Sequence, residues 1–317
     1  PAFLAGLLPY LYLPLRAASG PLLNWGNPDT LERLFWHVRG KQYTVWMFVG
    51  SKAASKQITY FLSSFPAEFA WIGLPLVLAG AIFAYRRHRN AGRLLLLLFV
   101  VCVLWAINYD IHDIDSYFLL AYLVSGMWCA YGLWALLHWM GQLKPAVLVA
   151  SAAVIVGIGV GMHWSGVSER DNHLVDDYTH NMFNSVKKNA LVLSYQWDYW
   201  VSASLYYQHV RGERRDITVI DKELLRRSWY FDQLRRTAPE AYRRSEAEIQ
   251  LFLSELRKWE QDEPYDAGIL ETRYNALIAS FVARNIADRP VYMTIEMEQH
   301  LAPDYERVPE GLALRLY

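Results

Sequence analysis

The sequence predicts a multi-pass α-helical membrane domain followed by a small α/β domain outside the membrane. Two observations predict this fold class. Four long apolar stretches lie between residues 65 and 164, and a fifth opens the chain, whereas the sequence from residue 165 onward is largely polar. A helix needs about 20 apolar residues to cross the hydrocarbon core of a bilayer, so these stretches have the length of membrane spans. The 317 residues suffice for two such units.

We expect residues 1–164 to form the membrane domain, with about five spans. The expected spans are residues 1–15, 65–85, 94–107, 116–139 and 145–164, and residues 16–64 form an amphipathic segment outside the membrane. The chain starts inside an apolar stretch with no initiator Met, so we expect a fragment that lacks earlier spans. Residues 165–317 form the soluble domain.

Basic residues predict the orientation. Arg86, Arg87, Arg89 and Arg93 lie in one short connector, which the positive-inside rule places in the cytoplasm. Alternation of the spans then places residues 108–115 and the soluble domain on the outer face. We expect a multi-pass protein of a bacterial inner membrane, with its C-terminal domain on the periplasmic side.

Two amphipathic patterns lie in the external segment. Leu31, Leu34, Phe35 and Val38 share one helical face, and Asn27 is the expected N-cap of that helix. The pattern recurs just before the second span, at Ile58, Phe61, Leu62 and Phe65. These helices either lie along the outer membrane surface or pack against the soluble domain.

Alternating apolar runs and helical patterns predict the soluble domain as α/β with a parallel sheet. The expected strands are residues 190–194, 217–220 and 291–297, and the expected helices are residues 199–210, 221–235, 249–256 and 270–281. The net charge is +0, which gives no electrostatic case for nucleic acid. The sequence lacks a Gly-rich phosphate loop, GxSxG, HExxH and CxxC, which argues against a nucleotide-driven or hydrolytic catalyst in the soluble domain. We expect no cofactor and assign no residue as a metal ligand.

The first candidate site is a donor-binding group just after the first span, formed by Arg16, Asn24, Trp25 and Asp29. The planar guanidinium of Arg16 suits a lipid-linked phosphate. The alternative is that Arg16 extends to lipid head groups and Asp29 only favours a helix N-terminus.

Acceptor- or sugar-binding residues are expected in two places. Asp110, Asp113 and Asp115 lie with His112 in one external loop, which suits a metal, a sugar or a general base, or is a solvated acidic turn. Trp197 and Asp198 follow a predicted strand, at the edge where α/β sheets bind ligands. Rings beside an acid suit carbohydrate; the alternative is an aromatic surface that docks onto the membrane portion.

Four segments carry a family resemblance. The run YLPLRAASGPLLNWGNPDTLERLFWHVRGKQY resembles a hallmark of the glycosyltransferase-C-like membrane proteins related to transmembrane protein 260, and YDIHDIDSYFLLAYL resembles a second recurring segment. DNHLVDDYTHNMFNSVKKNALVLS and RRDITVIDKELLRRSWYFDQL are similar to a third. Many bacterial relatives have Gly-Asp-Asn-Asp after the first strand of the soluble domain, whereas residues 196–200 here keep only Asp198.

The resemblance implies a glycosyltransferase-C-like fold, N-terminally incomplete, and an enzyme. It would be a protein O-mannosyltransferase that moves a sugar from a polyprenyl-phosphate donor to an acceptor hydroxyl with inversion. Its partners would be the lipid-linked sugar, a protein or glycan acceptor and the bilayer. The catalytic base is expected upstream of Pro1. The alternative is a non-catalytic, membrane-anchored carbohydrate-binding or assembly protein that uses Trp197, Asp198 and Trp200. A transporter is a weaker third, because few ionisable residues lie within the spans.

Overall fold

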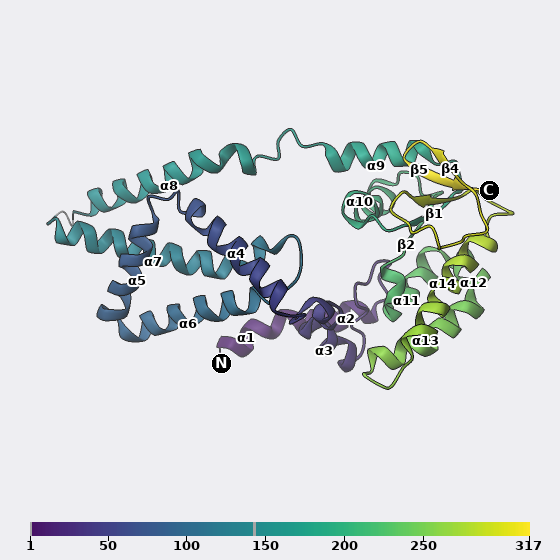
Figure 1. Cartoon of the computed structure of the whole chain (residues 1–317), viewed down its shortest axis with the longest axis horizontal. Coiled ribbons are helices and arrows are strands. Elements are labelled where there is room, and N and C mark those ends of the chain that lie inside the picture. The colour runs from purple at the N-terminus through teal and green to yellow at the C-terminus, as the bar shows by residue number, and fades with distance from the viewer. Residues whose placement is uncertain (1, 142–143) are drawn as a thin grey trace. The chain divides into compact units, whose positions relative to one another are not determined.

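The computed structural model describes residues 2–141 and 144–317, which fold as two compact units (Figure 1). One unit combines Pro1–Gln42 with Asn172–Tyr317, and the other comprises Tyr43–Asp171. The first 42 residues therefore group with the C-terminal part of the chain, although the sequence places them beside the membrane spans. Where the membrane domain begins and ends stays a prediction.

The second unit is helical. Its principal elements are α4 (Ser51–Glu68), α5 (Leu74–Arg87), α6 (Arg89–Ala106), η3 (Ile114–Phe118), α7 (Leu119–Trp139) and α8 (Pro145–Val167). Among the described residues, three helices are long and apolar enough to cross a membrane: Arg89–Ala106, Ile114–Trp139 and Pro145–Val167. A turn divides the expected span at residues 65–85 between α4 and α5, with positive φ at Ala70 and Trp71. The total number of spans stays a prediction.

Two glycines bring α5 and α7 into backbone contact. A Cβ atom at Gly80 would lie 1.7 Å from the carbonyl oxygen of Trp128, and one at Gly132 would lie 2.0 Å from that of Leu76. Both distances are far below van der Waals contact, so the two helices approach this closely only because neither position carries a side chain. Small residues at the crossing are a common means of packing apolar helices in lipid.

The amphipathic patterns of the external segment form the predicted helices. The first is α3 (Leu31–Arg39), and the second lies within α4. Phe61 of α4 is buried against Phe118, with ring centroids 4.5 Å apart. The expected N-cap of α3 is wrong: the Thr30 hydroxyl accepts a hydrogen bond from the Arg33 amide, at 3.2 Å, and so caps the helix.

The first unit contains a five-stranded sheet with the order β2-β1-β3-β5-β4. Its strands are β1 (Leu191–Ser194), β2 (Thr218–Asp221), β3 (Val291–Thr294), β4 (Arg307–Glu310) and β5 (Ala313–Leu316). The first three are parallel, which confirms the predicted core of the sheet, with Leu193 in register with Ile220 and Met293. The antiparallel hairpin β4–β5 was not predicted.

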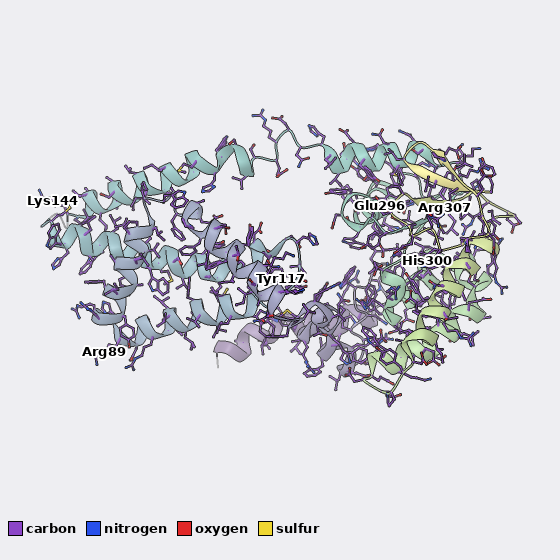
Figure 2. The ribbon with its side chains drawn as sticks, viewed as in Figure 1. Arg89, Tyr117, Lys144, Glu296, His300 and Arg307 are labelled. Atoms are coloured by element: carbon purple, nitrogen blue, oxygen red, sulfur yellow. The ribbon has the colours of Figure 1, made fainter. Side chains whose placement is uncertain are left out.

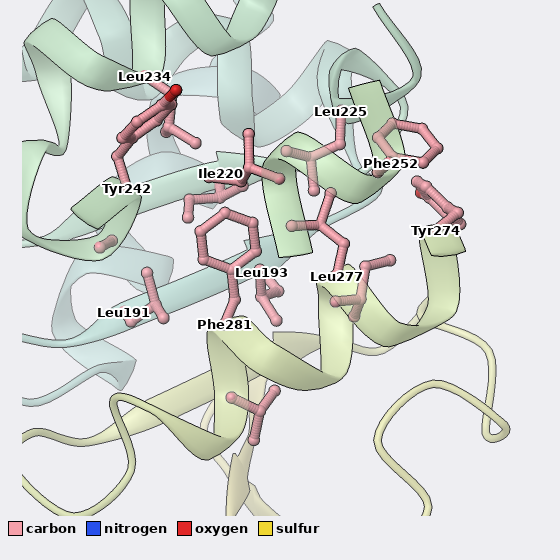
Figure 3. Packing of buried hydrophobic residues seen from close by; sticks show 14 of the residues in the cluster. Leu191, Leu193, Ile220, Leu225, Leu234, Tyr242, Phe252, Tyr274, Leu277 and Phe281 are labelled. Atoms are coloured by element: carbon pink, nitrogen blue, oxygen red, sulfur yellow. The ribbon is translucent and has the colours of Figure 1, made fainter. Parts of the chain in front are cut away.

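Helices cover both faces of this sheet. The elements on one face are α9 (Leu174–Ser185), η4 (Trp197–Val201), α10 (Ser202–Tyr206) and η5 (Tyr207–Arg211). Those on the other are η6 (Leu224–Arg226), α11 (Ser228–Thr237), α12 (Pro239–Arg244), α13 (Glu246–Glu260) and α14 (Ala267–Ala283). Leu191 and Leu193 share a core with Leu277 and Phe281 of α14 (Figure 3), whereas Val192 belongs to the core on the opposite face. This alternation follows from the two-residue period of a strand.

The helix predicted at residues 221–235 begins later than expected. Asp221 ends β2, and the chain makes a short 3-10 turn before α11 starts at Ser228. The carboxylate of Asp221 accepts a hydrogen bond from the Leu224 amide at 2.7 Å, which holds this turn. Asp221 therefore lies at the carboxyl edge of the sheet instead of opening a helix.

Candidate functional site

The loop between α2 (Tyr12–Ala18) and α3 packs on the α/β domain. The ring of Trp25 lies against Trp197 and Trp229, with centroids 5.3 Å and 5.0 Å away. Trp229 is buried, whereas 39% of the Trp25 surface is exposed. Trp25 thus anchors the loop by one part of its ring and leaves the rest accessible.

Two buried asparagines fix the loop around Trp25. The Asn24 backbone amide donates to Gln233 Oε1 at 3.2 Å, and its side-chain amide donates to Asn27 Oδ1 at 2.6 Å. Asn27 Nδ2 donates to Asp29 Oδ2 at 3.3 Å and to Asp232 Oδ2 at 3.2 Å. Buried amides need such partners, so these bonds specify one loop conformation.

One guanidinium joins the two carboxylates of this network. Arg33 Nη1 lies 3.4 Å from Asp29 Oδ1 and 3.2 Å from Asp232 Oδ2. The side chains of Arg33 and Asp232 are only 26% and 34% exposed, so solvent screens this pair less than it would a fully exposed one. Asp29 is consequently a fixed hydrogen-bond acceptor, held by both Asn27 and Arg33.

The backbone of the loop requires its residue types. Gly26 and Asn27 have φ of 75° and 39°, a region that glycine and asparagine adopt more readily than other residues. A Cβ atom at Gly26 would also lie 2.9 Å from Nδ1 of His37 on α3. Asn27, which the sequence suggested as a helix cap, therefore forms part of a tight turn.

Arg16 lies in the last turn of α2. Its Nη1 donates to the Ser19 hydroxyl at 3.1 Å, and that hydroxyl donates to the Arg16 carbonyl oxygen at 2.7 Å. Among the contacts of the described residues, none joins the Arg16 side chain to Asn24, Trp25 or Asp29. The structure thus brings together three of the four expected donor-site residues with α11, and leaves Arg16 with local contacts.

The acidic loop of the helical unit faces α4. Lys56 Nζ lies 3.2 Å from Asp110 Oδ1, and Asp115 accepts a hydrogen bond from Tyr60, which raises the pKa of Tyr60 to about 12. Asp113 precedes the short helix η3 without a side-chain cap. Within the described ranges, no group of three His, Cys, Asp or Glu side chains is arranged to hold a metal ion.

Trp197 and Asp198 open the π-helical turn η4 directly after β1. Trp197 is partly buried against Trp25, whereas Asp198 is exposed. This contact joins two parts of the same compact unit, so whether these rings bind carbohydrate or dock onto the membrane portion stays a prediction. Asp198 is accessible to a ligand.

Charged residues also gather where β2 ends. Asp221 is 1% exposed, and burial raises the pKa of its carboxyl to about 7. The neighbouring Lys222 pairs with Glu298 and Glu223, and its ammonium lies 4.6 Å from the centroid of the Tyr195 ring. These groups occupy the carboxyl edge of the sheet, beside the site described above.

Comparison with known proteins adds to this geometry. Residues 175–262 match the family described as TMEM260-associated domain 2. The mouse protein O-mannosyl-transferase TMEM260 is 26% identical over 261 residues, which cover 75% of this chain and 37% of the relative. The chain is related to TMEM260. The Dictyostelium discoideum protein O-mannosyl-transferase tmem260 is 19% identical over 362 residues, which cover 99% of this chain and 41% of the relative.

The chain spans about two fifths of the length of these two relatives. Its matched domain runs from α9 to just beyond α13, so it includes Trp197, Trp229 and Asp232. No solved structure matches the chain at a significant level.

Sequence reasoning missed the residues of α11 that hold the loop. Trp229, Asp232 and Gln233 contact residues about 200 positions earlier, and nothing in local spacing indicates such a pairing. The available signal was Asp232 itself, an acid on a helix face that also carries Trp229 and Gln233. It was insufficient because acids on helices are most often solvated.

Proposed function

We propose that this chain takes part in protein O-mannosyl transfer in a membrane. A mannose would move from a polyprenyl-phosphate carrier to a hydroxyl of a protein acceptor, with inversion at the anomeric carbon. The observation that carries the proposal is the relation to proteins named O-mannosyl-transferase. Three helices apolar enough to cross a bilayer support a membrane setting. The chain spans only part of those relatives, so the transfer activity of the whole protein is itself part of what we propose.

The chemistry requires a base, an attacking oxygen and a leaving phosphate. A carboxylate takes the proton from the acceptor hydroxyl as its oxygen attacks the anomeric carbon from the face opposite the phosphate. The bond from that carbon to the phosphate oxygen breaks, and the lipid phosphate leaves with the electron pair. We assign the role of this base to no residue that the structure describes.

On the donor side, we assign Arg16 to the lipid phosphate, because a guanidinium offers parallel donors to phosphate oxygens. Asn24, Trp25 and Asp29 would shape the donor site. The network around Asp29 supports this, since a carboxylate fixed by Asn27 and Arg33 is preorganised to accept hydrogen bonds from sugar hydroxyls.

We assign Trp197 and Asp198 of the α/β domain to acceptor or sugar binding. The exposure of Asp198 supports its share of this role. The acidic loop of the helical unit, with Asp110, Asp113 and Asp115, is proposed separately as an acceptor- or sugar-binding group. We place the α/β domain on the outer face of the membrane, where the lipid-linked donor would be presented, and a bacterial inner membrane is the proposed location. The glycosyltransferase-C-like fold of the helical part is also a proposal.

An apolar cavity in the helical unit suits the hydrocarbon part of a lipid. It has a volume of about 830 Å³ and is lined by residues of α5, α7 and α8, among them Phe83, Trp134, Ala152 and Ile155. We propose that a lipid chain occupies it. A second candidate function, non-catalytic carbohydrate binding, is favoured by the accessible acid and rings that follow β1.

The test is transfer of labelled mannose from polyprenyl-phosphate mannose to endogenous protein, in membranes from cells that produce the protein. Arg16→Ala should lower transfer about tenfold or more, as expected for a lost charge-assisted hydrogen bond. The matched control is Arg243→Ala, which removes an exposed guanidinium from α12 and should leave transfer within twofold. Absence of transfer by the unaltered protein, or full transfer by Arg16→Ala, would contradict the assignment.

A further inference from the structure

The direction in which the chain adds strands to the sheet reverses between β1 and β3. The connection from β1 runs through η4, α10 and η5 on one face to β2, whereas β2 returns through α11 to α14 on the other face to β3. The chain leaves β1 toward β2 on one side, and it leaves β3 toward the hairpin β4–β5 on the other, so the loops at these two carboxyl ends diverge. In open α/β sheets, ligands bind at this topological switch point.

Polar side chains meet at this point. Gln196, which follows β1, donates through Nε2 to Glu296 Oε1, which follows β3, at 3.4 Å. The backbone amide of Tyr195 donates to the Thr294 hydroxyl at 3.3 Å, and that of Gln196 donates to the Ser194 hydroxyl at 3.0 Å. The two strand ends are thus joined by side chains rather than by the ladder alone.

The second carboxylate oxygen of Glu296 differs from the first. Glu296 Oε2 is buried and has no hydrogen-bond partner among the residues that the structure describes. A buried acceptor without a donor costs more free energy than a typical hydrogen bond gains, so native structures seldom keep one without a reason. A ligand that brings a hydroxyl donor to Oε2 would remove this cost.

The loop that carries Glu296 is held in place. Arg307, which begins β4, donates to the carbonyl oxygens of Met297, Glu298 and Leu301 at 2.8, 2.7 and 2.6 Å. Figure 2 shows Glu296, His300 and Arg307 in this part of the α/β domain. These bonds fix the backbone that follows Glu296, and the contact with Gln196 orients its carboxylate.

We propose that the switch point between β1 and β3 is a carbohydrate-binding site in which Glu296 accepts a hydrogen bond from a sugar hydroxyl. Gln196 orients the carboxylate and has a carbonyl oxygen of its own for a second hydroxyl. Tyr195 and Tyr199, 46% and 43% exposed, supply rings for the apolar face of a sugar. The inference rests on the proposed function only for the choice of mannose as the sugar.

The experiment measures binding, not transfer. The full chain in lipid nanodiscs is titrated with α-linked mannose disaccharide, and with glucose and N-acetylglucosamine disaccharides, by saturation-transfer NMR. Glu296→Gln keeps the shape of the side chain and its contact with Gln196, but removes the charge. It should weaken binding about tenfold or more. Glu306→Gln, which removes an exposed carboxylate from the same segment, should bind like the unaltered protein.

Thermal unfolding gives a second readout. Without sugar, Glu296→Gln should unfold at the same or a higher temperature, because the oxygen that it replaces has no hydrogen bond to lose among the described residues. Equal binding by Glu296→Gln and the unaltered protein, or no binding of any disaccharide by the unaltered protein, would overturn the site. Loss of transfer in Arg16→Ala with intact sugar binding would separate this site from the donor assignment.

Discussion

Asn27 donates a hydrogen bond to Asp232 across 205 positions of sequence, with 3.2 Å between Nδ2 and Oδ2. The bond connects the loop before α3 with α11 of the α/β domain. The same carboxylate oxygen lies 3.2 Å from Arg33 Nη1, so one acid serves both an amide and a guanidinium. Asp232 is therefore a positioning residue for Asn24, Trp25 and Asp29.

Removal of Asp232 should loosen the loop. Asp232→Ala leaves the Asn27 amide and the Arg33 guanidinium each short of one acceptor, at an expected cost of about 1–3 kcal/mol. Hydrogen exchange should accelerate at residues 24–29, while the amides of β1 stay protected. Asp304→Ala, which removes an exposed acid from the same unit, is the control and should change neither quantity. Unchanged exchange at residues 24–29 in Asp232→Ala would refute the positioning role.

The crossing of α5 and α7 predicts that a Gly→Ala substitution changes stability differently at different glycines. Gly80→Ala and Gly132→Ala should each destabilise the helical unit by roughly 1–3 kcal/mol, because a Cβ atom would overlap the facing backbone. Gly126→Ala on α7 meets open space and should be neutral or slightly stabilising. Unfolding in detergent, followed by loss of helical circular dichroism, distinguishes these outcomes. Equal behaviour of the three variants would disprove the close crossing.

The hairpin β4–β5 depends on Gly311. Its φ is 63°, and a Cβ atom would lie 2.1 Å from the Ser185 hydroxyl oxygen. Gly311→Ala should lower the unfolding temperature more than Gly212→Ala. Both residues have positive φ, which costs alanine about 1–2 kcal/mol, but only Gly311 has no room for the methyl group. Equal shifts of the two variants would mean that Ser185 moves aside without cost.

The buried carboxyl of Asp221 predicts a pH dependence. Its folded pKa is about 7, above the usual value of 3.8, so the group is protonated in both states below about pH 4. Between pH 4 and 7 the unfolded state ionises first, and the contribution of this group to stability falls by roughly 2–4 kcal/mol. Asp221→Asn should therefore be more stable than the unaltered protein at pH 7.5 and nearly equal to it at pH 4.

Unfolding midpoints at the two pH values test this prediction. Asp304→Asn, at an exposed position, should follow the unaltered protein at both. If Asp221→Asn were less stable than the unaltered protein at pH 7.5, the charged carboxylate would be contributing more through its bond to the Leu224 amide than burial takes away.

Local patterns were enough to predict the elements with strong periodicity. The apolar runs that became β1, β2 and β3, and the amphipathic faces of α3, α13 and α14, appear in the structure near their expected positions. Strands β4 and β5 were not predicted. Strand β4 lies at the edge of the sheet, contains Pro309 and is little buried, and it therefore has no apolar run that would indicate a strand. The expected cap at Asn27 was wrong because its side chain bonds to Asp232 of α11 and to its neighbours Asn24 and Asp29.

The sequence by itself determined the division into apolar helices and an α/β domain, because hydrophobic periodicity is local and each window of residues carries its own signal. It also singled out Asn24, Trp25, Asp29, Trp197 and Asp198. Only the tertiary structure decided that Trp25 packs on Trp197 and Trp229, that Asp232 holds the loop, and that Glu296 meets Gln196. Such pairings join positions 100 or more residues apart, and they depend on sheet order and helix packing rather than on spacing along the chain.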